Sequence, residues 1–274
     1  MAQLANPRLP KDVPRPKDKG ASAGIRVESP TGGTPPIDLL RGASLFLDFD
    51  GTLVEIAERP DAVVVDAPLM TLLSELGDKL DGRLAIVSGR PCAEIDALFG
   101  DHPFSVGGSH GLEMRWSDGR LAAPAPPAGL DRVVARMRLL AEAYPAILIE
   151  KKPFSVALHY RGAPDAEADA LALAERLAAD TGLSLQIGKM VVELRLAGAD
   201  KGAALDAFMA ERPMRGTRPV FIGDDVTDEA AFAAAARAGG HGILVGARPT
   251  AAHYVLADVP ATRAWLKAAG EALT

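Results

Sequence analysis

The sequence predicts an α/β fold, in which a Rossmann-like parallel sheet carries an inserted α+β domain. Short, largely apolar runs at 43–47, 84–87 and 218–223 each lead into a polar residue, as strands buried on both faces of a parallel sheet do. Helical patterns separate these runs, as parallel crossovers require. Between 122 and 196, apolar and polar residues alternate instead, which indicates antiparallel strands with one open face.

The first part of the core is expected at 41–121. Its first strand ends at Asp48, and the apolar spacing of 67–80 predicts a helix. The second strand ends at Ser88, and Pro91 then opens a helix to about residue 99, because proline suits the first helical position. In parallel sheets the functional residues lie beyond the carboxyl ends of the strands. Asp48 and Ser88 both fall at such ends.

The inserted domain, 122–196, begins with a Pro/Ala linker. Helices are expected at 130–144 and 165–180, each followed by two strands. Successive side chains of a strand point to opposite faces, so every second residue lies on the same face. We expect the apolar faces to pack on the two helices. The predicted open face carries Lys189, Glu193, His159 and Arg161, with Glu150, Lys151 and Lys152 at an edge.

Strands and helices are again expected to alternate in 197–274, the second part of the core. Asp200 is a helix cap for 201–211, the strand at 218–223 ends in acids, and a helix (228–238), a strand (242–245) and a terminal helix (262–272) follow. Residues 1–40 contain seven prolines among Lys, Arg, Gly and Ser, with no periodic apolar pattern. This segment is expected to be a disordered tail.

Composition excludes several classes of protein. The chain has 274 residues and a net charge of −6, which argues against a nucleic-acid surface. Cys92 is the only cysteine, so a disulfide scaffold is excluded. No apolar window approaches the ~20 residues of a membrane span. The N-terminus shows no apolar signal segment, so a cytoplasmic protein is expected. The sequence has no signal for oligomeric state, and we expect a monomer.

Two groups of acids follow separate core strands. Asp48 and Asp50 leave one strand, and Asp224, Asp225 and Asp228 leave another. Carboxylates held close together raise each other's pKa and cost stability. A divalent cation removes that cost, and an oxygen-rich site suits Mg²⁺. One Asp-Gly loop alone would indicate ordinary capping acids; two groups on separate buried strands favour a metal site.

A hydroxyl and a lysine complete the set. Ser88 precedes a helix whose first N–H groups have no partner, and the two together can bind an anion. Lys201 begins another helix and adds a positive charge. Either residue alone would suggest a helix cap or a surface lysine. Carboxylates, a metal, a hydroxyl and a lysine are together the groups that phosphoryl transfer uses.

These motifs resemble those of the haloacid dehalogenase-like phosphatases. The resemblance rests on DFDGT at 48–52, Ser88, Lys201 and GDDVTD at 223–228. It implies that Asp48 is the nucleophile and that Asp50 is the general acid and base. Mg²⁺ would be held by Asp48, the backbone carbonyl of Asp50 and Asp224, with support from Asp225 and Asp228. The inserted domain matches the second cap position of that superfamily, a C2-type cap.

Longer strings, at 48–65, 87–90, 108–113, 188–195 and 223–229, resemble the trehalose-6-phosphate phosphatase family over nearly all of 44–266. Phe49 departs mildly from the pattern, where the family often has Tyr. The resemblance implies an enzyme of trehalose biosynthesis that hydrolyses trehalose 6-phosphate to trehalose and phosphate. It further implies that Lys189 and Glu193 grip the disaccharide, that Arg90 and His110 lie at the pocket mouth, and that one of Lys151 and Lys152 assists.

Other functions stay open at this stage. A related phosphatase for sucrose phosphate or mannosyl-phosphoglycerate would differ only in the cap strings. A sugar-phosphate sensor without catalysis would need neither Asp48 nor Asp50. The proline-rich tail could also be the functional part, with the folded domain as its anchor.

Overall fold

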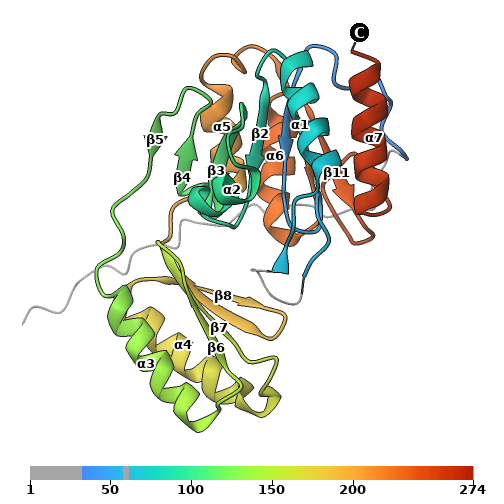
Figure 1. Cartoon of the computed structure of the whole chain (residues 1–274). Helices are drawn as coiled ribbons and strands as arrows, with labels where there is room; N and C mark the ends of the chain where they lie inside the picture. The colour runs from blue at the N-terminus through green and yellow to red at the C-terminus, as the bar shows by residue number, and fades with distance from the viewer. Residues whose placement is uncertain (1–32, 58–61, 274) are drawn as a thin grey trace, which may run out of the picture.

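The computed structural model describes residues 33–57 and 62–273. They form a core and a smaller cap, each with its own sheet (Figure 1). The core sheet has eight strands in the order β12-β11-β10-β1-β2-β3-β4-β5, parallel from β12 to β3 and antiparallel from β3 to β5. The strands are β1 (Ala43–Leu47), β2 (Leu84–Val87), β3 (Ser105–Gly108), β4 (Glu113–Arg115), β5 (Leu121–Ala122), β10 (Arg218–Gly223), β11 (His241–Val245) and β12 (Tyr254–Leu256).

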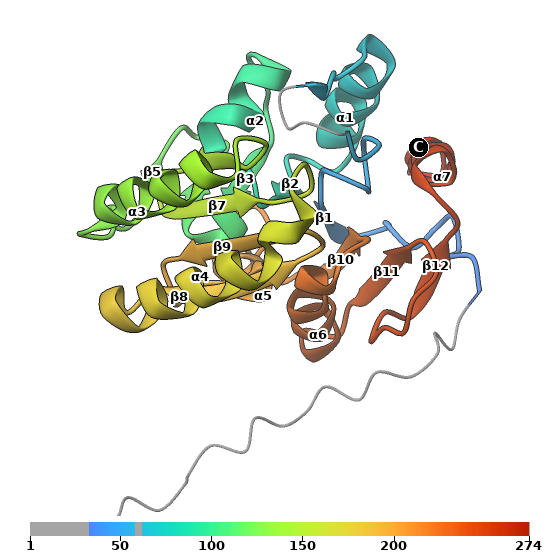
Figure 2. The same ribbon diagram turned by 90° about the horizontal axis from the view of Figure 1, so that it is seen from below.

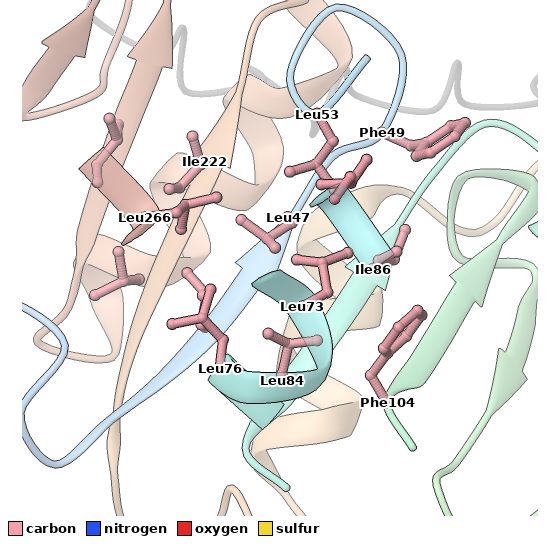
Figure 3. Close-up of a cluster of buried hydrophobic side chains, with 14 of the residues drawn as sticks. Leu47, Phe49, Leu53, Leu73, Leu76, Leu84, Ile86, Phe104, Ile222 and Leu266 are labelled. Atoms are coloured by element: carbon pink, nitrogen blue, oxygen red, sulfur yellow. The ribbon is translucent and has the colours of Figure 1, made fainter. Parts of the chain in front are cut away.

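Helices cover both faces of the core sheet. On one face lie α1 (Ala67–Lys79), α2 (Cys92–Phe99) and α7 (Val259–Glu271), and on the other α5 (Lys201–Met209) and α6 (Glu229–Arg237) (Figure 2). Along β1 the side chains alternate between them: Leu45 and Leu47 join the first apolar cluster, and Phe46 joins the second. Figure 3 shows Leu47 packed among residues of α1, β2 and α7 in the first cluster. Burial on both faces explains why these strands are almost wholly apolar.

The cap is an antiparallel sheet with two helices on one face. Its elements are α3 (Leu130–Ala143), β6 (Leu148–Lys151), β7 (Ser155–His159), α4 (Glu167–Thr181), β8 (Ser184–Gly188) and β9 (Val191–Arg195), with strand order β6-β7-β9-β8. Val156, Leu158, Val192 and Leu194 pack on the helices in a separate apolar cluster. The helices lie on the side of the cap sheet away from the core (Figure 1). The open face of the sheet is therefore turned toward the core.

The predicted fold class is confirmed, and most helix ends differ from the expected ones by one to three residues. Alternation-based reasoning did not identify the short strands β3, β4, β5 and β12, which carry too few residues for a periodic signal. Residues 33–40 differ from the expected tail. Leu39 and Leu40 are buried, and the Trp265 indole donates to the Pro35 carbonyl at 2.8 Å. The rest of the predicted tail, 1–32, lies outside the described residues.

Within the described residues, the structure has no helix that is long and apolar enough to span a membrane.

Candidate active site

The carboxyl ends of two neighbouring core strands bring the acids together. Strand β1 pairs with β10 up to Leu47 and Ile222, and the Asp48 N–H donates to the Ile222 carbonyl at 2.9 Å. Asp48 and Asp224 therefore leave adjacent strands at the same edge. Carboxylate oxygens of Asp48, Asp224 and Asp228 all lie within 4.8 Å of one another. The ends of the two strands thus bring Asp48 and Asp224 together, and Asp228 joins them in one acidic cluster.

Lys201 joins the acidic cluster from the first turn of α5. Its Nζ lies 2.8 Å from Asp48 Oδ1 and 2.7 Å from Asp228 Oδ1, and the residue is 2% exposed. Burial acts to lower the pKa of Lys201, but the charges of Asp228 and Asp48 outweigh it and raise that pKa above its ordinary value. The lysine is therefore a permanent cation. Asp200 sets the start of the helix, because its side chain accepts from the Ala203 N–H at 2.8 Å.

One cation does not balance the acidic cluster. Burial, and next the charge of Asp228, raise the pKa of Asp48 well above its ordinary value, although Lys201 acts in the opposite direction. Burial and Asp228 also raise the pKa of Asp224. Three carboxylates surround a single ammonium group, so their negative charge is not balanced by Lys201 alone. The donor set therefore fits Mg²⁺, which prefers carboxylate ligands.

Two glycines allow the strand ends to approach so closely. Gly51 has φ +81°, and a Cβ there would lie 2.2 Å from Asp224 Oδ2. A Cβ on Gly223 would lie 2.3 Å from Asp228 Cγ. Thr52 then donates its hydroxyl to Asp224 Oδ1 at 3.1 Å. The turn after β1 thus holds the carboxylate of Asp224 directly.

The remaining two acids take different positions. The sequence assigned Asp225 and Asp228 alike to supporting roles, but the Asp228 carboxylate lies in the acidic cluster itself and is fully buried. Asp225 is exposed, and its carboxylate is not part of the cluster; its backbone N–H donates to Asp228 Oδ2 at 2.9 Å. Asp225 supports the site through its main chain.

Asp50 lies apart from the acidic cluster and is held by Arg90. The guanidinium Nε lies 2.7 Å from Asp50 Oδ2, and Nη2 lies 2.8 Å from Oδ1. The Asp50 side chain is 35% exposed. Its carboxylate is thus accessible at the mouth of the site, as a group that exchanges protons with a substrate or water must be.

Ser88 and His110 lie on one compact pair of loops. Ser88 is buried; its Oγ accepts from the Arg90 N–H at 3.1 Å, and its carbonyl accepts from the His110 N–H at 2.9 Å. His110 has φ +56°, and its ring packs so closely on Gly89 that a Cβ there would lie 2.7 Å from Nε2. Burial, and then the charge of Lys201, lower the pKa of His110 to about 3, so the ring is neutral.

Glu113 is a site-supporting residue to which sequence reasoning assigned no role. Its Oε2 accepts from the Ser109 hydroxyl at 2.7 Å and from the Cys92 N–H at 3.2 Å. The carboxylate therefore joins the left-handed turn at Ser109 to the start of α2. A glutamate directly after the GSHGL string was the only available signal, and it does not distinguish a buried anchor from a surface residue.

The open face of the cap sheet carries a network of polar side chains. The register places Glu150, Ala157, Glu193 and Gln186 in one row across the four strands. His159 Nε2 lies 3.0 Å from Glu150 Oε2, and the Ser155 hydroxyl donates to Glu193 Oε1 at 2.6 Å. Lys152 Nζ lies 3.6 Å from Glu150 Oε1 and 4.0 Å from Glu193 Oε1. These groups can bind hydroxyls.

Three of the expected cap residues lie elsewhere. Lys151 pairs in register with the buried Val156, and its Nζ contacts Asp131 Oδ1 of α3 at 2.6 Å. It therefore belongs to the helix-covered face, because residues that are paired across two antiparallel strands lie on the same face of the sheet. Lys189 is exposed in the turn between β8 and β9, and Arg161 is exposed beyond β7.

A cavity of about 360 Å³ lies where the cap meets the core. Gln186 and Arg195 line it from the cap, and His110, Lys201 and Thr227 line it from the core. The cap strands thus approach the core next to the acidic cluster. Arg195 and Gln186 were not among the site residues proposed from sequence, because no motif distinguished either of them from the other polar residues of its strand.

A phosphatase of the haloalkanoate (HAD) enzyme superfamily and a haloacid dehalogenase-like hydrolase have the same fold as this chain in their solved structures. The trehalose-phosphatase family model matches residues 46–260. The chain belongs to this family, which makes it a phosphoric monoester hydrolase.

Individual proteins agree with that assignment. A probable trehalose-phosphate phosphatase of Sinorhizobium fredii is 43% identical over 81% of this chain and 84% of its own length. Trehalose-6-phosphate phosphatase of Escherichia coli is 40% identical with the same two coverages. A solved structure of a trehalose-6-phosphate phosphatase related protein has a TM-score of 0.71 and 32% identity, over 81% of this chain and 95% of that one.

Proposed function

We propose that the chain hydrolyses trehalose 6-phosphate to trehalose and phosphate, with Mg²⁺ and with Asp48 as the nucleophile. The observation that carries the proposal is the buried contact of Lys201 with Asp48, at the end of β1, and with Asp228. Membership of the trehalose-phosphatase family supports the choice of sugar. The two curated relatives named above act, by their names, on trehalose phosphate.

The acidic cluster would hold the metal. Asp48, Asp224 and Asp228 offer carboxylate oxygens, and the resemblance to the phosphatases adds the backbone carbonyl of Asp50 as a fourth candidate ligand. When bound, Mg²⁺ supplies positive charge that stabilises the negatively charged phosphoryl group during transfer. Lys201 stays beside Asp48 and orients the nucleophilic carboxylate.

The chain's own residues account for the two half-reactions. A carboxylate oxygen of Asp48 forms a bond to phosphorus while the bond from phosphorus to oxygen 6 of the sugar breaks, and Asp50 gives its proton to that oxygen. Asp50 then takes a proton from water, and the water oxygen forms a bond to phosphorus while the bond from phosphorus to the Asp48 oxygen breaks. Inorganic phosphate is released, and the Asp48 carboxylate is regenerated. Ser88 and the N–H groups beside it bind the phosphoryl oxygens.

Arg90 orients Asp50. In the structure its guanidinium bonds both oxygens of the Asp50 carboxylate. A guanidinium also attracts an anionic phosphate, so Arg90 can contact the phosphate of the substrate beside Asp50.

The cap would select the sugar. Lys152, Glu193 and Glu150 present charged donors and acceptors on the face turned to the core, and such groups suit the many hydroxyls of a disaccharide. Lys189 lies at the tip of the β8–β9 hairpin, so it can reach the sugar if cap and core move together.

Two substitutions test the catalytic roles. Asp48→Asn should abolish turnover, because no carboxylate is left to form the phosphoenzyme. Asp50→Asn should lower kcat by about 10²- to 10⁴-fold, the usual contribution of a general acid and base. Asp78→Asn, on the exposed side of α1, is the matched control and should retain wild-type activity. Phosphate release and circular dichroism are measured on all three. Normal turnover by folded Asp48→Asn protein would refute the proposed nucleophile.

A further inference from the structure

An arginine outside the acidic cluster bonds the main chain of the segment that carries two of its acids. Arg248 lies in the loop between β11 and β12. Its Nε donates to the Asp224 carbonyl at 2.8 Å and its Nη2 to the Asp225 carbonyl at 2.5 Å. The two carbonyls belong to the segment that leaves β10 and carries the acids of the cluster.

The two carbonyls differ in their other partners. The pairing of β10 with β11 ends at Gly223 and Leu244, so both carbonyls lie just beyond the ladder. The Asp225 carbonyl also accepts from the Asp228 N–H at 3.0 Å, whereas the Asp224 carbonyl receives its donor from Arg248. Because Arg248 bonds both carbonyls through one rigid, planar group, it restrains the relative orientation of two consecutive peptide units.

Glu229 anchors the arginine. Arg248 Nη1 contacts Glu229 Oε1, which also accepts from the Thr250 hydroxyl at 2.8 Å, and Glu229 Oε2 accepts from the Ala251 N–H at 2.8 Å. Glu229 is 8% exposed and begins α6. The carboxylate therefore joins the start of α6 to the β11–β12 loop, and it balances the charge of the guanidinium.

The two sides of Asp224 are thus held by different elements. Thr52 donates to its carboxylate, and Arg248 donates to its backbone carbonyl. We propose that Arg248 is a positioning residue that keeps Asp224 in the orientation needed to bind Mg²⁺. This inference rests on the proposed function. Residues behind metal ligands commonly set metal affinity by fixing the orientation of those ligands.

The proposal predicts that the shape of the side chain matters rather than its charge. A lysine keeps the charge but offers a single ammonium, which cannot bond two carbonyls and Glu229 in the same fixed geometry. Arg248→Lys and Arg248→Met should therefore both weaken Mg²⁺ binding, by about 10- to 100-fold. At saturating Mg²⁺, kcat and the KM for the sugar phosphate should stay close to wild type.

The experiment measures Mg²⁺ binding to the full-length protein by calorimetry in the absence of substrate. Arg237→Lys is the matched control: this arginine of α6 pairs with Asp206 on the surface, at 3.1 Å, and its loss should leave the Mg²⁺ Kd unchanged. Wild-type Mg²⁺ affinity in folded Arg248→Met would overturn the proposal. So would full affinity in Arg248→Lys beside weak affinity in Arg248→Met, because the effect would then be one of charge.

Two further measurements keep the outcome clear. If the Arg248 variants do not fold, Glu229→Gln replaces them: it keeps Arg248 and weakens its anchor, so a smaller loss of Mg²⁺ affinity is expected, and an unchanged Kd contradicts the proposal. Wild-type protein is assayed in parallel. If it shows no Mg²⁺-dependent phosphate release, the proposed function fails. If wild type is active and the variants bind Mg²⁺ normally, only the role of Arg248 fails.

Discussion

Lys151 and Lys152 are consecutive residues, yet their ammonium groups lie on opposite faces of the cap sheet. Lys151 Nζ lies 2.6 Å from Asp131 on α3, whereas Lys152 Nζ lies 3.6 Å from Glu150 and 4.0 Å from Glu193 on the face turned to the core. Lys152 also contributes to the lowered pKa of His110, a core residue. Of the two lysines, only Lys152 faces the place where the substrate would lie.

Alanine substitutions at these two positions form a matched pair. Lys152→Ala should raise the KM for trehalose 6-phosphate by about tenfold or more, since a charge-assisted hydrogen bond contributes about 1.5–3 kcal/mol. Lys151→Ala should leave KM unchanged, because it removes only an exposed ion pair with Asp131. Steady-state kinetics at saturating Mg²⁺ make the comparison. Equal effects of the two substitutions would contradict the assignment of faces.

A second prediction concerns the turn after β1. Gly51→Ala should greatly reduce turnover and Mg²⁺ binding, because the added Cβ would lie 2.2 Å from Asp224 Oδ2. Gly42→Ala is the control: Gly42 also has a positive φ, +65°, but nothing lies within 4 Å of the added Cβ. Both variants should lose about 1–2 kcal/mol of stability from the left-handed conformation. Only Gly51→Ala should also lose activity; a fully active Gly51→Ala enzyme would show that the turn can move away from Asp224.

The buried His110 predicts a dependence of stability on pH. Its pKa is about 3 in the folded protein and about 6.5 in the unfolded chain. Below pH 6.5 the unfolded state binds the additional proton, so stability falls as the pH decreases toward 3. Between pH 7 and pH 5 the imidazole should account for a loss of about 2 kcal/mol. Urea unfolding of wild type and His110→Gln at both pH values measures the change in the free energy of unfolding. The variant should lose less stability than wild type, and equal losses would contradict a neutral, buried His110.

Much of the site follows from strand patterns in the sequence. An apolar run that ends in an acid indicates a buried strand with a carboxylate at the functional edge of a parallel sheet, and this reasoning placed Asp48 and Asp224 correctly beside each other. Alternation in the cap likewise predicted which side chains of β7 and β9 face the helices. Both inferences depend on side-chain periods that backbone geometry imposes.

Other features depend on contacts that no local pattern encodes. Arg248 bonds main-chain atoms 24 residues earlier in the chain, and the sequence of its own loop contains no motif that predicts this contact. Leu39 and Leu40 lack a periodic apolar neighbourhood, yet both are buried against the core. Lys151 lies in the edge strand β6, as expected, but the sequence did not show which face of the sheet it takes, because one residue of register decides the face.

The most direct test of the central claim is phosphate release from a panel of sugar phosphates, measured with Mg²⁺ and with EDTA. The panel contains trehalose 6-phosphate, sucrose 6-phosphate, mannosyl-phosphoglycerate and glucose 6-phosphate. Selective release from trehalose 6-phosphate that stops in EDTA is the predicted result. Full activity in EDTA would contradict the metal site, and release from every compound at similar rates would contradict selection of the sugar by Lys152 and Glu193. Release from none would contradict the proposed function itself.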